Sequence, residues 1–182
     1  MRKSLPMIAA LIVALAVPVL GQLRAPAAGP DNSPKVGDMA PDFAVSRGGR
    51  GAPASNLKDF QGKKNVMLMF FPGAFTPFCT TEFTEAGAQA DKFAALNIEI
   101  LGISADLPGA QAAFKTAVMA KNTFVSDRDL SISTKYDANG ADSAKRYYFL
   151  IDQTGKIIWK STNNSLIPTE KLLTDVTPLL KK

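Results

Sequence analysis

The chain has 182 residues, of which 46% are hydrophobic, 20% charged and 8% aromatic. This mixture is typical of one globular domain, and it excludes a disordered polar chain, a collagen-like fibre and a small disulfide-stapled protein. There is no histidine, and Cys79 is the only cysteine. A Ser-His or Cys-His pair, a His-ligated zinc and an internal disulfide are therefore excluded, so Cys79 acts alone or with another molecule.

The formal charge of +5 comes largely from the N-terminal segment. Residues 1–27 contain Arg2, Lys3 and Arg24 and no acidic residue, which leaves 18 basic and 16 acidic residues in the rest of the chain. A balance this even gives no support for nucleic-acid binding.

The same segment has the layout of a secretory signal peptide. Arg2 and Lys3 precede an apolar stretch at 7–20, and small residues follow it. This order predicts cleavage after Val-Leu-Gly21 or after Ala-Pro-Ala27. An uncleaved membrane anchor is the alternative, although the stretch is shorter than the roughly 20 residues that span a bilayer.

These features divide the chain into three parts. We predict a signal peptide at 1–27, a flexible proline-containing linker at 28–35 and one folded domain at 36–182. The domain is then expected to work outside the cytoplasm, in a periplasmic or similar compartment, or tethered to a membrane if the signal is not cleaved.

Three continuous apolar runs predict strands that are buried on both faces, at 65–71, 98–103 and 147–151. Between the first two runs, apolar residues recur at helical spacing over 83–94. Between the second and third, alanines over 112–120 predict another helix, followed by a short strand at 123–125.

The C-terminal part continues this alternation. Asp152-Gln-Thr-Gly155 predicts a hairpin turn into a strand at 156–159. A last helix is expected over 169–180, where Pro178 could end it early. This order predicts an α/β sandwich with a mixed central sheet flanked by helices. The glycine-rich segment 48–51 is interpreted as a turn, because it lacks the ending and the strand-to-helix setting of a phosphate-binding loop.

The segment 72–82, PGAFTPFCTTE, follows the first apolar run. Thr76 and Pro77 predict a helix start, with the threonine hydroxyl as cap and proline at the first helical position. Cys79 then lies in the first turn, where unpaired backbone N–H groups and the helix dipole favour a thiolate. The competing interpretation is that Cys79 is a small buried hydrophobic residue.

These residues resemble the peroxiredoxins, because Pro72-x-x-x-Thr76-x-x-Cys79 is similar to the active-site pattern of that family. Three further segments resemble the family in the same order. VGDMAPDF at 36–43 is similar to its opening hairpin, LKDFQGK at 57–63 to its lead into the first core strand, and RYYFLID at 146–152 to the strand that begins with its catalytic arginine. The resemblance implies a thioredoxin-like fold with an N-terminal β-hairpin and thiol peroxidase activity.

The resemblance also implies a role for each residue of the motif. Cys79 would be the nucleophile that attacks peroxide, Thr76 would hydrogen-bond the bound peroxide, and Pro72 would shield the sulfenic acid from water. Arg146 would stabilise the thiolate and polarise the O–O bond, and Glu82 would orient Arg146 through an ion pair. The alternatives are a cap for Thr76, a turn for Pro72, a surface ion pair for Arg146 and a solvated helix position for Glu82.

The sequence departs from many relatives in having no second, resolving cysteine, and Thr84 occupies one common place for it. The expected reductant is therefore an external thiol, either thioredoxin-like, glutaredoxin-like or a small molecule. Neither a cofactor nor a metal is implied, and a homodimer is compatible with the family. Tyr147 and Tyr148 follow Arg146 where a small hydroxyl residue is commoner, which leaves the shape of the pocket open.

Two other functions are compatible with the fold. A thiol–disulfide oxidoreductase normally needs Cys-x-x-Cys, whereas this chain has Thr76-Pro-Phe-Cys79. A non-catalytic binding protein is the second alternative, and the joint presence of Thr76, Cys79 and Arg146 argues against it.

Overall fold

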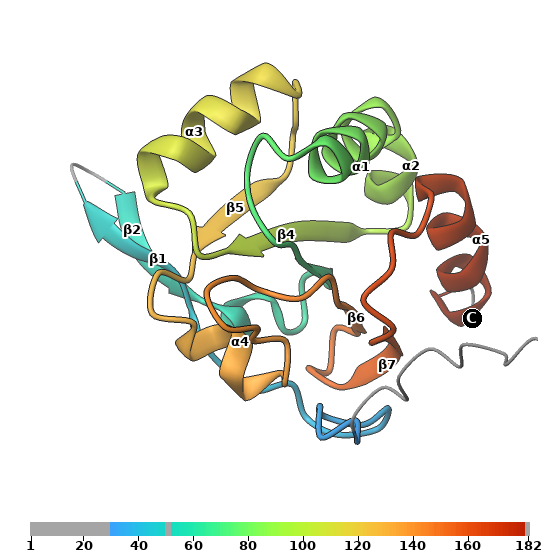
Figure 1. Cartoon of the computed structure of the whole chain (residues 1–182). Coiled ribbons are helices and arrows are strands. Elements are labelled where there is room, and N and C mark those ends of the chain that lie inside the picture. Colours follow the sequence, from blue (N-terminus) through green and yellow to red (C-terminus); the bar gives the residue numbers. More distant parts are fainter. Residues whose placement is uncertain (1–29, 50–51, 181–182) are drawn as a thin grey trace, which may run out of the picture.

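The computed structural model describes residues 30–49 and 52–180, and its centre is a five-stranded mixed sheet (Figure 1). The strand order is β5-β4-β3-β6-β7. The first three strands run parallel, while β6 is antiparallel to β3 and β7 is antiparallel to β6. The bounds of the strands are β3 Asn65–Phe70, β4 Ile98–Ser104, β5 Thr123–Ser126, β6 Tyr148–Ile151 and β7 Ile157–Ser161. The predicted strands and the mixed sheet are confirmed.

Side chains alternate between the two faces of the sheet and build one apolar cluster on each. On β6, Tyr148 and Leu150 belong to one cluster, and Phe149 and Ile151 to the other. This is the period of two that a strand imposes. Four helices cover the face of Tyr148, namely α1 Pro77–Ala88, α2 Ala90–Ala95, α3 Pro108–Ala117 and α5 Thr169–Leu180 (Figure 1). The short helices η1 Leu57–Phe60 and α4 Ser131–Lys135 contribute to the opposite cluster.

Two of the predicted helices differ in their bounds from the sequence prediction. The apolar pattern over 83–94 forms two helices, because the backbone of Gln89 leaves the helical conformation between them. The helix expected at 112–120 begins earlier, at Pro108, and ends at Ala117, because Met119 adopts a left-handed φ of 50°. Proline at the first position of α3 has no N–H to leave unpaired, which suits a helix start.

Pro178 does not end the last helix, which runs from Thr169 to Leu180 with the proline inside it. α4 is absent from the sequence prediction, because its five residues are too few to show a helical period. The buried Asp127 anchors this helix by accepting hydrogen bonds from the backbone N–H groups of Ile132, at 2.9 Å, and of Ser133, at 2.7 Å.

The N-terminal hairpin exists, but it lies further along the chain than the resemblance implied. It consists of β1 Ala44–Gly49 and β2 Ala52–Asn56, whereas in the segment 36–43 Met39 forms an isolated bridge with Lys156. The assignment of 36–43 as the hairpin is therefore wrong, because this segment runs beside the β6–β7 turn. Gly48 and Gly49 end β1, and residues 50 and 51 of the predicted turn lie outside the described residues.

The turn at 152–155 is confirmed as the β6–β7 connection. Gly155 donates its N–H to the Asp152 carbonyl at 2.9 Å and has a φ of +85°, which glycine adopts without strain. The Asp152 carboxylate accepts hydrogen bonds from the backbone N–H groups of Thr154, at 2.8 Å, and of Lys156, at 3.0 Å.

The start of the described chain is held against the sheet. Lys160 of β7 lies 2.8 Å from the Asp31 carboxylate and 2.8 Å from the hydroxyl of the buried Ser33. Part of the segment predicted as a linker therefore contacts the domain. The predicted signal peptide lies outside the described residues. Within the described part of the chain, no helix has the length and apolar character needed to cross a membrane.

An aromatic cluster fixes α1 against the sheet. Phe83, one helical turn after Cys79, is fully buried, and its ring centroid lies 4.8 Å from those of Phe71 and Phe124 and 5.9 Å from that of Phe114. Such ring pairs add to the free energy that burial alone supplies. The position of α1, and with it that of Cys79, therefore depends on this packing.

Replacing Phe83 by alanine should lower the free energy of unfolding by about 3–5 kcal/mol, because it leaves a cavity among three rings. Phe78 on the same helix is 67% exposed. Phe78→Ala is the matched control, and we expect a change within about 0.5 kcal/mol. Urea unfolding followed by tryptophan fluorescence measures both variants. Equal effects of the two substitutions would contradict this account of the packing.

Candidate active site

The site begins in the loop between β3 and α1. Pro72 opens this loop directly after the buried Phe71, and the backbone N–H of Ala74 donates to the Asp106 carboxylate at 2.8 Å. Phe75 has a left-handed φ of 64°, a conformation that costs free energy in a residue other than glycine. The bond to Asp106 and the contact of the Phe75 ring with Phe114, at 5.3 Å between centroids, hold the loop in this shape.

Thr76 is the N-cap of α1 and Pro77 its first residue, as predicted. The predicted capping hydrogen bond is wrong, because the Thr76 side chain makes no bond to the helix. Its hydroxyl instead donates to the carbonyl of Gly73 at 3.0 Å, back into the loop. Thr76 is exposed, so a rotation about χ1 would free this hydroxyl for another partner.

Cys79 lies in the first turn of α1, as predicted, and its side chain is fully buried. The sulfur is therefore closed off from solvent in this conformation. The apolar side chains of Phe71 and Phe83 belong to the same buried cluster as Cys79. A molecule from solvent can reach the sulfur only when neighbouring side chains move.

Sheet topology brings Arg146 to this sulfur from 67 residues away in sequence. Because β6 is antiparallel to β3, the start of β6 lies beside the end of β3, with Tyr148 opposite Met69. Arg146 precedes β6 by two residues and therefore lies at the edge of the sheet from which α1 begins. Its backbone N–H donates to the Asn164 side chain at 2.7 Å, which fixes the main chain at this point.

The guanidinium of Arg146 connects two groups of α1. Its Nη2 lies 2.9 Å from the sulfur of Cys79, and its Nε lies 3.1 Å from the carboxylate of Glu82. The second Glu82 oxygen accepts a short hydrogen bond from the hydroxyl of Tyr148. Exposure is 0% for Cys79, 1% for Glu82, 7% for Arg146 and 0% for Tyr148, so the four groups form one buried network.

The electrostatics follow from this burial. Burial raises the pKa of Glu82, and the hydrogen bond from Tyr148 and the charge of Arg146 act in the opposite direction. Burial raises the pKa of Tyr148 as well, and the neighbouring Glu82 carboxylate adds to the effect. Burial alone would lower the pKa of Arg146, but attraction to Glu82 and to the Cys79 sulfur outweighs it and the pKa is raised.

Sequence reasoning missed Tyr148. A signal was available, since residues two apart on a strand share a face and Arg146 stands two positions before Tyr148. The alternative of a solvated helix position for Glu82 is wrong, because its carboxylate is buried in the ion pair with Arg146. Pro72, Thr76, Cys79, Glu82 and Arg146 thus all lie in or beside one site, with Pro72 and Thr76 on its loop.

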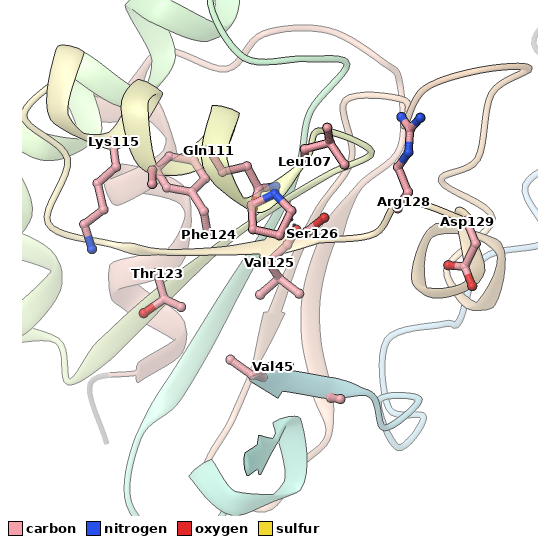
Figure 2. Close-up of a pocket in the computed structure, with 13 residues that line it drawn as sticks. Val45, Leu107, Gln111, Lys115, Thr123, Phe124, Val125, Ser126, Arg128 and Asp129 are labelled. Atoms are coloured by element: carbon pink, nitrogen blue, oxygen red, sulfur yellow. Dashed lines mark hydrogen bonds between the residues drawn. The ribbon is translucent and has the colours of Figure 1, made fainter. Parts of the chain in front are cut away.

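None of the surface clefts described for the structure is lined by the four residues of this network. A cleft of about 760 Å³ lies between the start of α3, β5 and Val45 of β1, and Figure 2 shows Lys115 at one end and Arg128 and Asp129 at the other. None of the five predicted site residues lines it. A smaller cleft of about 320 Å³ is lined by Pro72, Leu107 and Arg128. Within the described residues, no group of three histidine, cysteine or acidic side chains is arranged to hold a metal ion.

A thioredoxin-like fold in which a guanidinium lies 2.9 Å from the only thiol is the arrangement expected of a class of enzymes, the thiol peroxidases. Residues 36–160 match the AhpC/TSA family, and the chain belongs to this family. It is 32% identical to peroxiredoxin Bcp of Escherichia coli over 134 residues, which cover 69% of this chain and 84% of that protein. It is 36% identical over 141 residues to the chloroplastic 2-Cys peroxiredoxin BAS1 of Hordeum vulgare, covering 72% of this chain and 67% of that one.

Solved structures agree with the fold. The reduced 2-Cys peroxiredoxin of Plasmodium vivax superposes with a TM-score of 0.67 at 30% identity, covering 79% of this chain and 81% of that one. Peroxidoxin BcpB of Mycobacterium tuberculosis gives a TM-score of 0.70 at 24% identity, covering 80% and 97% of the two chains. The predicted thioredoxin-like peroxiredoxin fold is therefore confirmed, and the chain is a thiol peroxidase.

Proposed function

We propose that Cys79 is the residue that reduces hydrogen peroxide or an organic hydroperoxide. Its thiolate attacks one peroxide oxygen, so that an S–O bond forms as the O–O bond breaks. The electron pair of the O–O bond leaves with the second oxygen, which takes up a proton to give water or an alcohol. Cys79 becomes a sulfenic acid, and the peroxide is reduced by two electrons.

The observation that carries this proposal is the 2.9 Å approach of Arg146 to the sulfur. A free cysteine with a pKa of about 8.5 is only about 3% thiolate at neutral pH. Full ionisation would raise the rate by only about 30-fold, and a lower thiol pKa also weakens the nucleophile. The remaining acceleration must come from donors that meet the charge developing on the two oxygens. Arg146 can provide such donors, because a guanidinium has five N–H groups and these bonds use two.

The other residues of the site support this step. The Thr76 hydroxyl, now bonded to the Gly73 carbonyl, would turn to hydrogen-bond the bound peroxide. Pro72 would shield the sulfenic acid from water. Glu82 would hold Arg146 in place through the buried ion pair.

Regeneration requires a thiol from outside the chain, because Cys79 is the only cysteine and the position of Thr84 carries an exposed threonine. An external thiol would attack the sulfenic sulfur and release water, giving a mixed disulfide. A second thiol would then free Cys79 and leave as the oxidised disulfide. Thioredoxin-like proteins, glutaredoxin-like proteins and small thiols can all perform this exchange, and a homodimer of this chain stays a prediction.

Substitution of Cys79 and Arg146 tests the proposal. After mixing with stoichiometric hydrogen peroxide, a sulfenic-acid reagent should label the wild-type chain at Cys79 within seconds and leave Cys79→Ser unlabelled. Arg146→Ala should slow labelling by about 100-fold or more, since it removes an electrostatic donor from the reacting atoms. Quench-flow labelling followed by mass spectrometry measures both rates.

The control is Lys64→Ala, which removes a cation from the partly exposed ion pair with Glu99 at the other end of β3. It should leave the rate unchanged. Oxidation as slow as that of a free thiol, with no dependence on Arg146, would reject the assignment of Cys79 as a peroxidase residue. That result would favour a non-catalytic binding protein. Disulfide exchange without peroxide reduction would favour the oxidoreductase.

Excess peroxide should drive Cys79 beyond the sulfenic state. The chain has no second thiol to capture the sulfenic acid, so a second peroxide molecule can oxidise it to sulfinic acid. Mass spectrometry of the chain treated with excess peroxide in the absence of thiols should show two added oxygens at Cys79. An added thiol reductant should suppress the product. Only unmodified or disulfide-linked Cys79 would contradict a one-cysteine cycle.

We also propose that the chain is exported, with the segment 1–27 as its signal. Arg2, Lys3 and the apolar stretch at 7–20 support this proposal. The full-length chain expressed in a Gram-negative host should enter the periplasm and begin at Gln22 or Ala28, as N-terminal sequencing would show. Replacing Arg2 and Lys3 by aspartate should retain the chain inside the cell. Recovery of the wild-type chain from the cell interior with its N-terminal segment intact would reject the proposal.

A further inference from the structure

The buried network contains one side chain that the thiol chemistry does not explain, the tyrosine at position 148. It lies on the face of the sheet that α1 covers and is fully buried. Its hydroxyl donates to one oxygen of Glu82 and accepts a hydrogen bond from the backbone N–H of Ile167 at 3.3 Å. A hydroxyl with one donor and one acceptor bond of this kind has a fixed orientation.

The two oxygens of Glu82 are thus divided between two partners. One receives the Nε of Arg146 at 3.1 Å, and the other receives the Tyr148 hydroxyl. A carboxylate that is 1% exposed depends on such donors, because water cannot replace them. Removing the hydroxyl would leave one oxygen without this partner and would favour the protonated acid.

Protonation of Glu82 would act on the reacting sulfur through Arg146. The guanidinium divides its donors between Glu82 and Cys79, so the ionised carboxylate fixes the direction of the Nη2 that lies 2.9 Å from the sulfur. A neutral Glu82 would attract the guanidinium less strongly, and the alignment of Arg146 with Cys79 would be lost for part of the time.

We infer that Tyr148 is a positioning residue of the peroxidase site, which holds Glu82 in the orientation and ionisation state that aligns Arg146 with Cys79. This inference rests on the proposed function of Cys79. The bond from Ile167 extends the network to the segment between β7 and α5, and Thr169 at the start of α5 donates its N–H to Glu85 at 3.3 Å.

The pH dependence of Cys79 oxidation tests this inference, because a merely structural role of Tyr148 would leave that dependence unchanged. The groups that act on the Glu82 carboxyl are Tyr148 on β6, Arg146, and Glu85 on α1, and Arg146 also contacts Cys79. The Tyr148 hydrogen bond lowers the pKa of Glu82 against the effect of burial, so its loss raises that pKa further. In a plot of the Cys79 oxidation rate against pH, the fall in rate at acidic pH should therefore begin at a higher pH in Tyr148→Phe than in the wild type.

The matched control is Tyr147→Phe, the same chemical change one residue away. Tyr147 is also buried, but it faces the other side of the sheet, where Lys145 lies 5.4 Å from the centre of its ring. Tyr148→Phe should slow Cys79 oxidation by about tenfold at neutral pH, the size expected for a hydrogen bond to a charged group. Tyr147→Phe should leave both the rate and the pH profile as in the wild type.

A double-mutant cycle with Glu82→Gln separates positioning from packing. Glutamine does not ionise in this range, so adding Tyr148→Phe to Glu82→Gln should move the pH profile no further. Incorporation of 3-fluorotyrosine at position 148 keeps the ring and strengthens the donor, so it should shift the fall in rate to lower pH. This second variant tests the inference even if Tyr148→Phe does not fold.

A wild-type rate and pH profile in Tyr148→Phe would overturn the inference, as would equal slowing by Tyr148→Phe in the wild-type and Glu82→Gln backgrounds. These failures differ from failure of the proposed function, which would appear as slow oxidation of the wild-type chain or as no effect of Arg146→Ala.

Discussion

The structure depends on one constraint, the placement of a cation beside a buried sulfur. A guanidinium and a carboxylate that leave water lose hydration worth several kcal/mol each, and only close pairing compensates for this loss. Arg146 achieves that pairing with Glu82 at 3.1 Å while it also approaches Cys79 at 2.9 Å. The hydroxyl of Tyr148 completes the bonding of the carboxylate. The site is therefore a single electrostatic unit, in which a change at one group alters the others.

The fold makes this unit possible through the direction of its strands. β3, which is parallel to β4, ends at the loop that leads into α1. Because β6 is antiparallel to β3, the N-terminal end of β6 lies at the same edge of the sheet. α1 carries both Cys79 and Glu82 on its buried side, three residues apart, as the helical repeat requires for neighbours on one face. The aromatic cluster around Phe83 then fixes the distance between helix and sheet.

Burial of the sulfur has a consequence for catalysis. Cys79 and Arg146 are both buried, so water does not screen the charge of the guanidinium at the sulfur. The same burial keeps peroxide out until side chains move. The loop at 72–76 and the exposed Phe78 are the parts of the site nearest to solvent, and Thr76 already carries a hydroxyl that is not committed to the helix.

Local sequence patterns were sufficient to predict the strands, most of the helices and the residues of the motif. Continuous apolar runs and a proline at a helix start are local signals, and the order of family-like segments identified Arg146 as the partner of Cys79. The tertiary structure alone decided that Cys79 is buried, that Thr76 bonds to Gly73 and not to the helix, and that Tyr148 reaches Glu82. These facts depend on distances between elements, which arise from the packing of α1 on β3 and β6. Local sequence patterns indicate which face of a helix or strand a side chain lies on. The residue that it contacts on a neighbouring element depends on how the elements pack in the fold.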